Sequence, residues 1–302
     1  MKATARIGGW LGNLGNLVRK TVAPAQPAGT PAAPKIGLAL GGGFARGIAH
    51  AGVLQVFEQH QIPIHCITGV SAGSIAAAAY ASGASPEEIA RAACAMRFGD
   101  VARWSISRMG FVVSERMRKF LEKLLKHYRF EEMRIPLGVL ATDLITGKPV
   151  CFRDSGDVFL PVRASCAYPG LFQPVVYEGR SLVDGAISME IPALLARQLG
   201  ATHVVSVHLP AAEEAQLPRN IFQVVNRCMQ ILQARTEEAW RKDSDLIIAP
   251  DVCGVQWDGF ESGPDLLRAG EMAALAAVPK IQSWLPKPQP APAPGKAVAS
   301  SA

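Results

Sequence analysis

Two apolar segments, each followed by a glycine-containing turn and a helix, constrain the fold of this chain most strongly. Residues 35–40 are apolar after Lys35 and end at three glycines, and residues 46–59 then carry apolar side chains at helical spacing. Residues 64–70 form a second apolar run, and the alanine-rich segment 71–81 follows it. Short apolar runs that alternate with helices are typical of buried parallel strands. A βαβα order within about 50 residues therefore predicts an α/β fold with a parallel sheet that helices cover on both faces.

The rest of the chain continues this alternation. Ser85 and Pro86 have the residue types of a helix N-cap and a first helical position, and Ser114 is expected to cap a second helix. Residues 178–179 separate two strand-like segments, which predicts a hairpin. Gly200 follows a helical segment, as a C-cap glycine does. The further strands are expected at 137–141, 150–152, 173–177, 180–183, 203–207 and 246–248, and the further helices at 191–199, 220–240 and 265–284.

The net charge of +6 belongs to the two ends of the chain. Residues 1–35 carry five basic and no acidic side chains, and residues 286–302 carry two basic and none acidic, whereas residues 36–285 hold 24 basic and 25 acidic side chains. A chain body of balanced charge gives no support for nucleic-acid binding. Both ends are rich in proline and alanine, as linkers are. We therefore expect a basic flexible tail at 1–34, one domain at 35–285 and a Pro/Ala-rich tail at 286–302.

The sequence gives little indication of export or of a membrane span. Four glycines and two asparagines interrupt the apolar residues between Arg6 and Arg19, which does not fit a secretory signal, although a surface-seeking helix in this segment stays open as an alternative. The uncharged stretch 60–85 contains Pro63 and many small residues, which favours a strand followed by a buried helix. The six cysteines show no zinc-like spacing and mostly lie in apolar runs, so we expect buried, reduced thiols. These features predict a cytoplasmic protein, with peripheral contact at a membrane left open.

The sequence G-V-S-A-G at 69–73 is a candidate nucleophile turn. It has the form G-x-S-x-G and lies between an apolar strand and a helix, the context in which this pattern presents a reactive serine. Small residues beside Ser71 make the sharp turn sterically possible, and the helix N-terminus favours negative charge that develops nearby. The alternative interpretation is a serine helix cap with incidental glycines.

The sequence G-G-G-F-A-R-G at 41–47 lies between the first strand and the first helix. It does not fit the dinucleotide pattern G-x-G-x-x-G, because Arg46 or Phe44 falls where a glycine is needed. It does not fit the P-loop either, because Ile48 follows Gly47 where that motif has lysine. Glycine N–H groups free of side chains can approach a substrate carbonyl, so the segment is a candidate oxyanion loop. A simple tight turn remains the alternative.

A serine nucleophile needs a base, and the residues alone do not decide whether a histidine supplies it. Hydrolases with a serine, an acid and a histidine in that chain order are common, and His203 and His208 both follow Asp184. Both histidines, however, lie in or beside a short apolar strand, where a structural role is more usual.

The motifs of the chain together resemble those of one family, the patatin-like phospholipases, and in particular its bacterial members and the catalytic domain of neuropathy target esterase. The motifs that carry the resemblance are G-G-G-F-A-R-G at 41–47, G-V-S-A-G at 69–73, A-T-D-L-I-T-G at 141–147, A-S-C-A-Y-P-G-L-F-Q-P at 164–174 and D-G-A at 184–186. The resemblance covers about residues 36–209. One departure is Phe44, which stands where the strict plant motif has its third glycine.

The resemblance implies a three-layer α/β/α fold with a mainly parallel central sheet, and a serine–aspartate dyad with neither histidine nor cofactor nor metal. Ser71 would be the nucleophile and Asp184 the base. Because a free aspartate has a pKa of about 3.9, well below the working pH, we predict that Asp184 is desolvated, has a raised pKa and binds the Ser71 hydroxyl directly. The oxyanion-hole glycines would be Gly41, Gly42 and Gly43, and the residues that support the motifs would be Arg46, Gly47, Gly69, Gly73 and Gly185.

The resemblance also implies a substrate class, the carboxylic esters of phospholipids, lysophospholipids or related lipids, cleaved through an acyl-enzyme. Two alternatives stay open: an acyltransferase that uses the same dyad, and a non-catalytic scaffold that binds lipid or regulates a partner. The segment 97–113 alternates arginines with large apolar residues, so it is either an ordinary connecting helix or an anchor at a lipid interface. The oligomeric state and the headgroup do not follow from the sequence.

Overall fold

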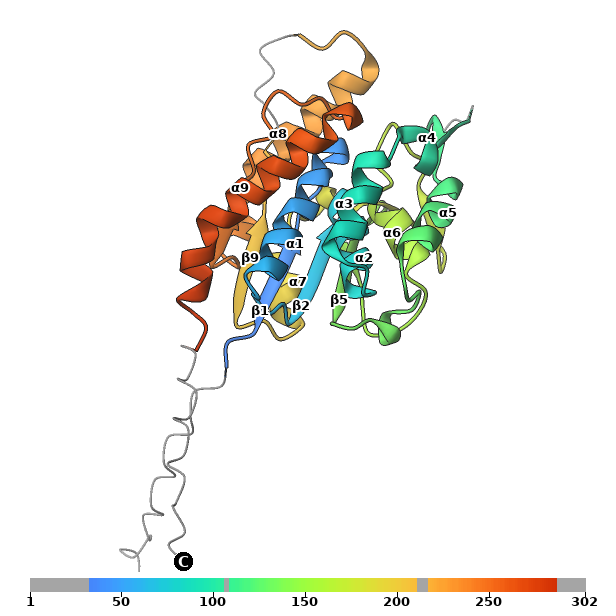
Figure 1. Cartoon of the computed structure of the whole chain (residues 1–302). Helices are drawn as coiled ribbons and strands as arrows, with labels where there is room; N and C mark the ends of the chain where they lie inside the picture. Colours follow the sequence, from blue (N-terminus) through green and yellow to red (C-terminus); the bar gives the residue numbers. More distant parts are fainter. Residues whose placement is uncertain (1–32, 106–108, 211–216, 287–302) are drawn as a thin grey trace, which may run out of the picture. The chain divides into compact units, whose positions relative to one another are not determined.

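The structure, a computed structural model, describes residues 33–105, 109–210 and 217–286 of the chain (Figure 1). Its main element is an eight-stranded sheet with the hydrogen-bonded order β10-β9-β1-β2-β5-β8-β7, in which β6 also pairs with β5. The greater part of both predicted tails lies outside the described residues. Each segment predicted as a strand from 35–40 to 246–248 contributes a strand to this sheet.

Five neighbouring strands of the sheet are parallel and include the two apolar runs that opened the sequence analysis. Their register places Leu40 of β1 level with Gly69 of β2 and with Val207 of β9. The turns that follow these strands therefore meet at one edge of the sheet, where α/β proteins bind their ligands. In sheet order the parallel strands are β10 (Leu246–Ile248), β9 (His203–Val207), β1 (Ile36–Leu40), β2 (Cys66–Val70) and β5 (Leu137–Asp143).

Three further strands are antiparallel to their neighbours. Strands β7 (Val175–Tyr177) and β8 (Arg180–Asp184) form the predicted hairpin, whose two turn residues, Glu178 and Gly179, both have positive φ, as a tight hairpin turn requires. Strand β8 pairs with β5, and so does β6 (Pro149–Phe152). The sheet is thus mainly parallel with an antiparallel end.

The larger helical layer covers one face of the sheet. Its helices α1 and α9 contact each other along their length, as Figure 1 shows, and both contact α3. Glycines allow this close contact, because a Cβ on Gly52 of α1 would lie 2.1 Å from a backbone oxygen of α9. The helices of this layer are α1 (Ala49–Gln59), α2 (Ala72–Ala81), α3 (Pro86–Ala95), α6 (Phe159–Ser165) and α9 (Gly263–Gln282), with α4 (Phe98–Val101) and α5 (Glu115–Leu124) at its margin.

The opposite face carries α7 (Ala193–Gln198) and α8 (Ile221–Arg241). Small residues of the strands explain why α7 lies so close to the sheet. Ala39 of β1 and Cys66 of β2 pack against α7 in a core separate from the larger one, and a Cβ on Gly37 would lie 2.6 Å from the Cβ of Ala201. Apolar helices on both faces of a mainly parallel sheet confirm the predicted three-layer α/β/α fold.

One predicted helix cap is present, whereas a second cap and the segment 97–113 need correction. Helix α3 has the predicted cap at Ser85, completed by Glu88 as a capping box. Ser114 occupies the N-cap position of α5, but its hydroxyl accepts a hydrogen bond from Arg163 and caps nothing. The segment 97–113 is no connecting helix, because the four-residue α4 leads into a two-stranded sheet of β3 (Arg103–Trp104) and β4 (Val112–Val113).

The expectation of buried cysteines was wrong for half of them. Only Cys66 and Cys166 are buried, and Cys94 is half-buried, whereas Cys151, Cys228 and Cys253 are exposed. Cys151 lies on the edge strand β6, where alternate residues face solvent, whereas Cys228 lies on a largely exposed part of α8 and Cys253 follows β10. All six are free thiols.

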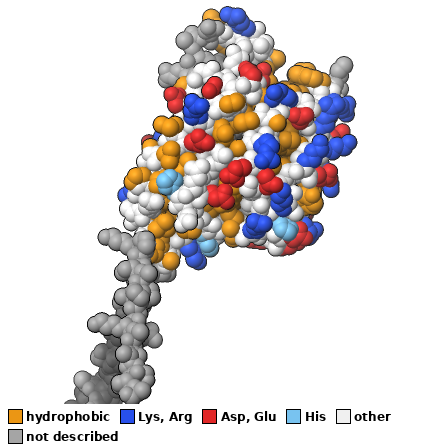
Figure 2. Space-filling view, in the orientation of Figure 1, with side chains coloured by type: hydrophobic (Ala, Val, Ile, Leu, Met, Phe, Trp, Pro, Cys, Tyr) orange, Lys and Arg blue, Asp and Glu red, His pale blue; other side chains and the backbone are white. Residues whose placement is uncertain are grey.

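The described surface is mixed in charge. Figure 2 shows basic and acidic side chains together across the face on which α1 and α9 lie. None of the helices that the structure describes is both long enough and apolar enough to cross a bilayer.

Candidate active site

The turn between β2 and α2 holds Ser71 in an unusual backbone conformation. Its φ of 52° and ψ of −128° lie in a region that residues with a side chain rarely adopt. Glycines on both sides make the turn possible, because a Cβ on Gly69 would lie 2.4 Å from the Gly73 oxygen, and one on Gly73 would lie 2.4 Å from the Leu40 oxygen. The turn therefore has the geometry that the G-x-S-x-G pattern predicts.

Two further serines fix the backbone of this turn. The N–H of Ser71 donates to Oγ of Ser165 on α6 at 2.8 Å, and Oγ of Ser74 donates to the Ser71 oxygen at 2.6 Å. Both supporting side chains are fully buried. Backbone strain persists only where its surroundings fix it, which these bonds do. The sequence analysis missed both roles, although Ser165 lies within the motif at 164–174.

The glycine loop after β1 lies against the nucleophile. A Cβ on Gly42 would lie 3.2 Å from the Ser71 Cβ, so the missing side chain leaves room at the reactive hydroxyl. The Gly41 N–H donates to the Val207 oxygen of β9 at 3.1 Å, so Gly41 adjoins the proposed donors and its own N–H is already bonded. Within the described parts of the chain, the N–H groups of Gly42 and Gly43 make no hydrogen bond. Two donors therefore remain available beside Ser71.

The other residues of this loop fix its shape. Phe44 has a positive φ of 51°, the conformation that glycine adopts freely, and its ring contacts Tyr168 and Trp257 edge-on. This packing explains how phenylalanine takes the place of the third glycine. Arg46 donates to the Pro210 oxygen at 2.9 Å and to the Gly43 oxygen at 3.4 Å, as expected of a residue that fixes the loop. A Cβ on Gly47 would lie 2.5 Å from the Ala72 Cβ.

Asp184 reaches the same edge because β2 and β8 share one side of β5. Leu140 pairs with Val70 of β2 on one side and with β6 on the other, and Ala141 pairs with Asp184 on one side and with β6 on the other. Because β6 pairs with the opposite side of β5 throughout, β2 and β8 pair with the same side of β5. The pairing with β2 ends at Leu140, and the pairing with β8 begins at Ala141. The two strands run toward each other, so the residues at their ends, Ser71 and Asp184, meet.

The turn after Asp184 also requires a glycine. A Cβ on Gly185 would lie 2.2 Å from the Leu140 oxygen, and the Thr142 hydroxyl donates to the Gly185 oxygen at 3.3 Å. The close approach of Gly185 to β5 turns the chain into the short helix Gly185–Ile187. Asp184 is thereby held at the strand end with its carboxyl directed into the site.

The Asp184 carboxyl is buried and only half satisfied. Its residue is 1% exposed, Oδ1 accepts from the Ala186 N–H at 2.9 Å, and Oδ2 has no hydrogen-bond partner in the described structure. Burial raises the pKa of Asp184 to about 7, against the weaker lowering effects of the Ala186 N–H and the nearby Ser71 hydroxyl. The predicted desolvation is confirmed. Among the described residues the Ser71 hydroxyl lies close enough to lower the pKa of Asp184, although Oδ2 makes no hydrogen bond of ideal geometry with it. Catalytic contacts are often long before substrate binds.

A pocket of about 400 Å³ opens onto these groups. Helix α8 supplies one wall, and Tyr168, whose hydroxyl donates to Asn226 at 3.0 Å, joins that wall to the motif at 164–174. No described residue of the segment 97–113 lines the pocket. The lining residues include Gly42, Gly43, Phe44, Arg46, Ser71, Tyr168, Asp184, Ala186, Glu190, His208, Leu209, Arg227, Gln230, Ile231, Arg235 and Glu237.

The comparisons with known proteins agree with this fold. Residues 38–197, a little over half of the chain, match the family model for patatin-like phospholipases. The chain belongs to the patatin-like phospholipase family. The fold class and the resemblance drawn from the motifs are therefore confirmed.

Relatives of this patatin-like chain include proteins of the NTE family. An uncharacterised NTE family protein of Mycobacterium tuberculosis is 33% identical over 183 residues, which are 60% of this chain and 50% of the relative. The Lysophospholipase NTE1 of Mycosarcoma maydis is 27% identical over 257 residues, which are 78% of this chain and 13% of that protein. The chain spans half or less of the length of these curated relatives.

A solved structure shares the fold. The crystal structure of VipD from Legionella pneumophila superimposes with a TM-score of 0.57 over 83% of this chain and 67% of that one, at 13% identity. At such low identity the likeness shows the patatin-like fold alone.

Among the described residues, the two histidines considered as bases make their polar and ring contacts away from Ser71 and Asp184. His203 begins β9, at the sheet edge opposite Ser71, and its ring stacks against Trp284. His208 lines the pocket, but its Nε2 pairs with Glu190 Oε1 at 3.2 Å. Among the described residues, no hydrogen bond joins either imidazole to Ser71 or Asp184.

Proposed function

We propose that this chain is a serine acyl hydrolase of lipid esters that works through a Ser71–Asp184 dyad. The observation that carries the proposal is the buried Asp184 carboxyl, whose Oδ2 has no partner, at the strand end that meets the strained Ser71 turn. Within the described chain the Gly42 and Gly43 N–H groups have no hydrogen-bond partner, and both glycines line the pocket that contains Ser71. A base, a nucleophile and oxyanion donors thus converge on one pocket.

The reaction begins when Oδ2 of Asp184 takes the Ser71 proton as Oγ attacks the ester carbonyl. The carbonyl oxygen becomes an oxyanion that the Gly42 and Gly43 N–H groups stabilise, a contribution of about 3 kcal/mol per donor. Collapse of this intermediate breaks the ester bond, and the leaving alcohol takes the proton from Asp184. Water then gives a proton to Asp184 as it attacks the acyl-Ser71 ester. When this second intermediate collapses, the bond from the acyl carbon to Oγ breaks, Asp184 returns the proton to Oγ, and the fatty acid and the free serine are released.

The raised pKa of Asp184 explains how a carboxylate serves without a histidine. A base works best when its pKa is near the working pH, and burial brings the pKa of this carboxyl to about 7. An ordinary aspartate, with a pKa of about 3.9, would be too weak a base by roughly 4 kcal/mol.

The pocket supports a substrate that carries a phosphate. Arg227 and Arg235 of α8 contribute two guanidinium groups to its lining, which also contains the carboxyl groups of Asp184, Glu190 and Glu237. Guanidinium groups bind phosphate well. A curated relative bears the name lysophospholipase, which also favours a lysophospholipid over a neutral ester.

The test uses an alkyl fluorophosphonate, which reacts with activated serines. The full chain should be labelled, and Ser71→Ala should abolish the labelling, while Ser82→Ala, a buried serine outside the site, should not. Lysophosphatidylcholine should release fatty acid with the wild type and not with Ser71→Ala. An added alcohol acceptor tests the acyltransferase alternative. If most of the acyl chains are transferred to this alcohol and not to water, the protein is an acyltransferase. A folded wild type that neither reacts with the probe nor releases fatty acid would support the scaffold alternative.

A further inference from the structure

A buried histidine of α1, which the dyad does not use, contacts the oxyanion loop. His50 is fully buried, and its Nε2 lies 2.8 Å from the Gly41 oxygen. We propose that His50 is a positioning residue that orients the Gly41–Gly42 peptide so that the Gly42 N–H faces the oxyanion. The inference rests on the proposed function and adds to it a residue that contacts neither the dyad nor the substrate.

The contact defines the tautomer of the ring. A carbonyl oxygen only accepts hydrogen bonds, so Nε2 must carry the proton that His50 shares with Gly41. Nδ1 is then an unprotonated acceptor, and it is buried with no hydrogen-bond partner. Burial lowers the pKa of His50 to about 4, so the ring stays neutral at neutral pH.

The unpaired Nδ1 argues against a merely structural role. A buried polar atom without a partner is unfavourable, and an apolar side chain in this core position would avoid that cost. The presence of a histidine here is explained if its hydrogen bond to Gly41 is needed to shape the site. That bond goes to the loop that holds the oxyanion donors.

Peptide geometry carries the effect from Gly41 to Gly42. The carbonyl of Gly41 and the N–H of Gly42 belong to one planar peptide unit, and the described chain contains no cis peptide. In a trans unit these two groups point in opposite directions. Because the Gly41 oxygen is held toward His50, the Gly42 N–H points away from α1, and Gly42 lies in contact distance of Ser71.

The His50 contact matters because the peptide lies between two glycines. Gly-Gly units rotate easily, and a flipped peptide would present an oxygen in place of a donor to the developing oxyanion. Among the described hydrogen bonds, the one from His50 is the only one that the Gly41 oxygen accepts. Gly73 contributes space, since a Cβ there would lie 2.5 Å from that oxygen.

Two variants separate the hydrogen bond from the volume of the ring. His50→Leu removes the donor, whereas His50→Gln places an amide N–H at a similar reach. With lysophosphatidylcholine as substrate, His50→Leu should lower kcat about 100-fold, the typical effect of one lost oxyanion donor, with KM changed less than threefold. His50→Gln should recover kcat to within about tenfold of the wild type. The rate of phosphonylation by the fluorophosphonate should follow the same order.

The controls distinguish this inference from the proposed function. His203→Leu, at the opposite edge of the sheet, should leave kcat unchanged. Thermal unfolding should show His50→Leu folded, with a melting temperature within a few degrees of the wild type, because the removal of the unpaired Nδ1 offsets the loss of the Gly41 hydrogen bond. If His50→Leu does not fold, His50→Asn, whose shorter amide does not reach Gly41, takes its place and should be slower than His50→Gln. An active wild type with equal kcat in the Leu and Gln variants would overturn the role of His50 alone, whereas an inactive wild type would overturn the proposed function.

Discussion

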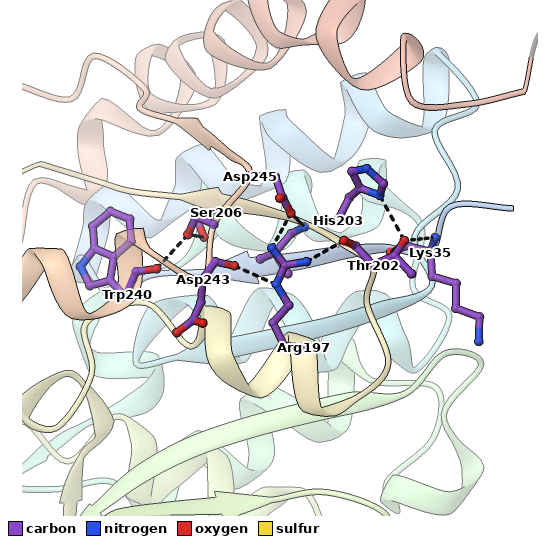
Figure 3. Close-up of polar contacts among 10 residues, drawn as sticks. Lys35, Arg197, Thr202, His203, Ser206, Trp240, Asp243 and Asp245 are labelled. Carbon is purple, nitrogen blue, oxygen red and sulfur yellow. Dashed lines mark hydrogen bonds and ion pairs between the residues drawn. The ribbon is translucent and has the colours of Figure 1, made fainter. Parts of the chain in front are cut away.

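The two edges of the parallel sheet, where its strands begin and where they end, differ in how their polar groups are hydrogen-bonded. At the edge where the strands begin, Arg197 pairs with Asp245 at 2.6 Å and donates to the Thr202 and Asp243 oxygens (Figure 3). Asp245 also accepts from the Val204 N–H, and Thr202 accepts from the Lys35 N–H. Side-chain hydrogen bonds thus hold the residues that immediately precede β1, β9 and β10 at this edge.

At the edge where the strands end, polar groups are left unpaired or strained. Ser71 has a positive φ, and both Oδ2 of Asp184 and Nδ1 of His50 are buried without partners. The N–H groups of Gly42 and Gly43 are also unused within the described chain. The difference indicates that one edge stabilises the fold, whereas the other retains unpaired and strained groups at a cost in stability, as expected if that edge holds the proposed site.

The largest expected effect comes from Ser71→Gly. The nucleophile is lost, so turnover should fall by about four orders of magnitude or more. Glycine adopts the φ of this turn freely, so the free energy of unfolding should rise by about 1 kcal/mol. Steady-state fatty-acid release and urea unfolding measure the two effects. A variant that loses both activity and stability would contradict the idea that this edge is strained.

The next effect concerns the pH dependence of stability. The unfolded Asp184 ionises near pH 3.9 and the folded one near pH 7, so the folded state holds a proton that the unfolded state releases between these values. Stability from this group is complete below about pH 4 and is lost as the pH rises through 7. Between pH 5 and pH 8 the wild type should lose about 3 kcal/mol relative to Asp184→Asn. Cys166 and Tyr168, which face Asp184, are common to both proteins. A pH-independent difference between the two would exclude a raised pKa for Asp184.

A smaller effect is expected at the opposite edge. Arg197→Met removes the Asp245 pair and two bonds to carbonyl oxygens, so the free energy of unfolding should fall by about 2 kcal/mol, with kcat within threefold of the wild type. Arg129→Met, which breaks an exposed pair with Glu131, serves as the control and should cost less than about 1 kcal/mol. A large loss of kcat in the folded Arg197 variant would show that the two edges are not separate in function.

Much of the fold could be predicted because its signals are local. Glycines and helix caps mark where strands and helices end, so the turn at Ser71 and the cap at Ser85 were placed correctly. The antiparallel pairing of β6 and β8 with β5 was not predicted, because it depends on contacts between segments far apart in the sequence. Helix α7 is shorter than expected because it begins only after Pro192.

For the proposed site, too, the sequence predicts what depends on local motifs and misses what depends on distant contacts. The motifs predicted Ser71, Asp184 and the glycine loop as the site, but not which glycine N–H groups are free, because that depends on the neighbouring β9. Ser165 contacts Ser71 across 94 residues, and no local pattern reports such a contact. His50 lies nine residues from Gly41, yet its role needs the ring to be buried beneath the loop.

The pH profile of serine labelling tests the dyad most directly. The rate of fluorophosphonate inactivation should rise with pH to a plateau with a midpoint near pH 7, because only the ionised Asp184 accepts the Ser71 proton. Asp184→Asn should react slowly and without that midpoint, while His208→Ala should keep it. If the midpoint survives in Asp184→Asn and disappears in His208→Ala, the base is a histidine and the dyad is wrong.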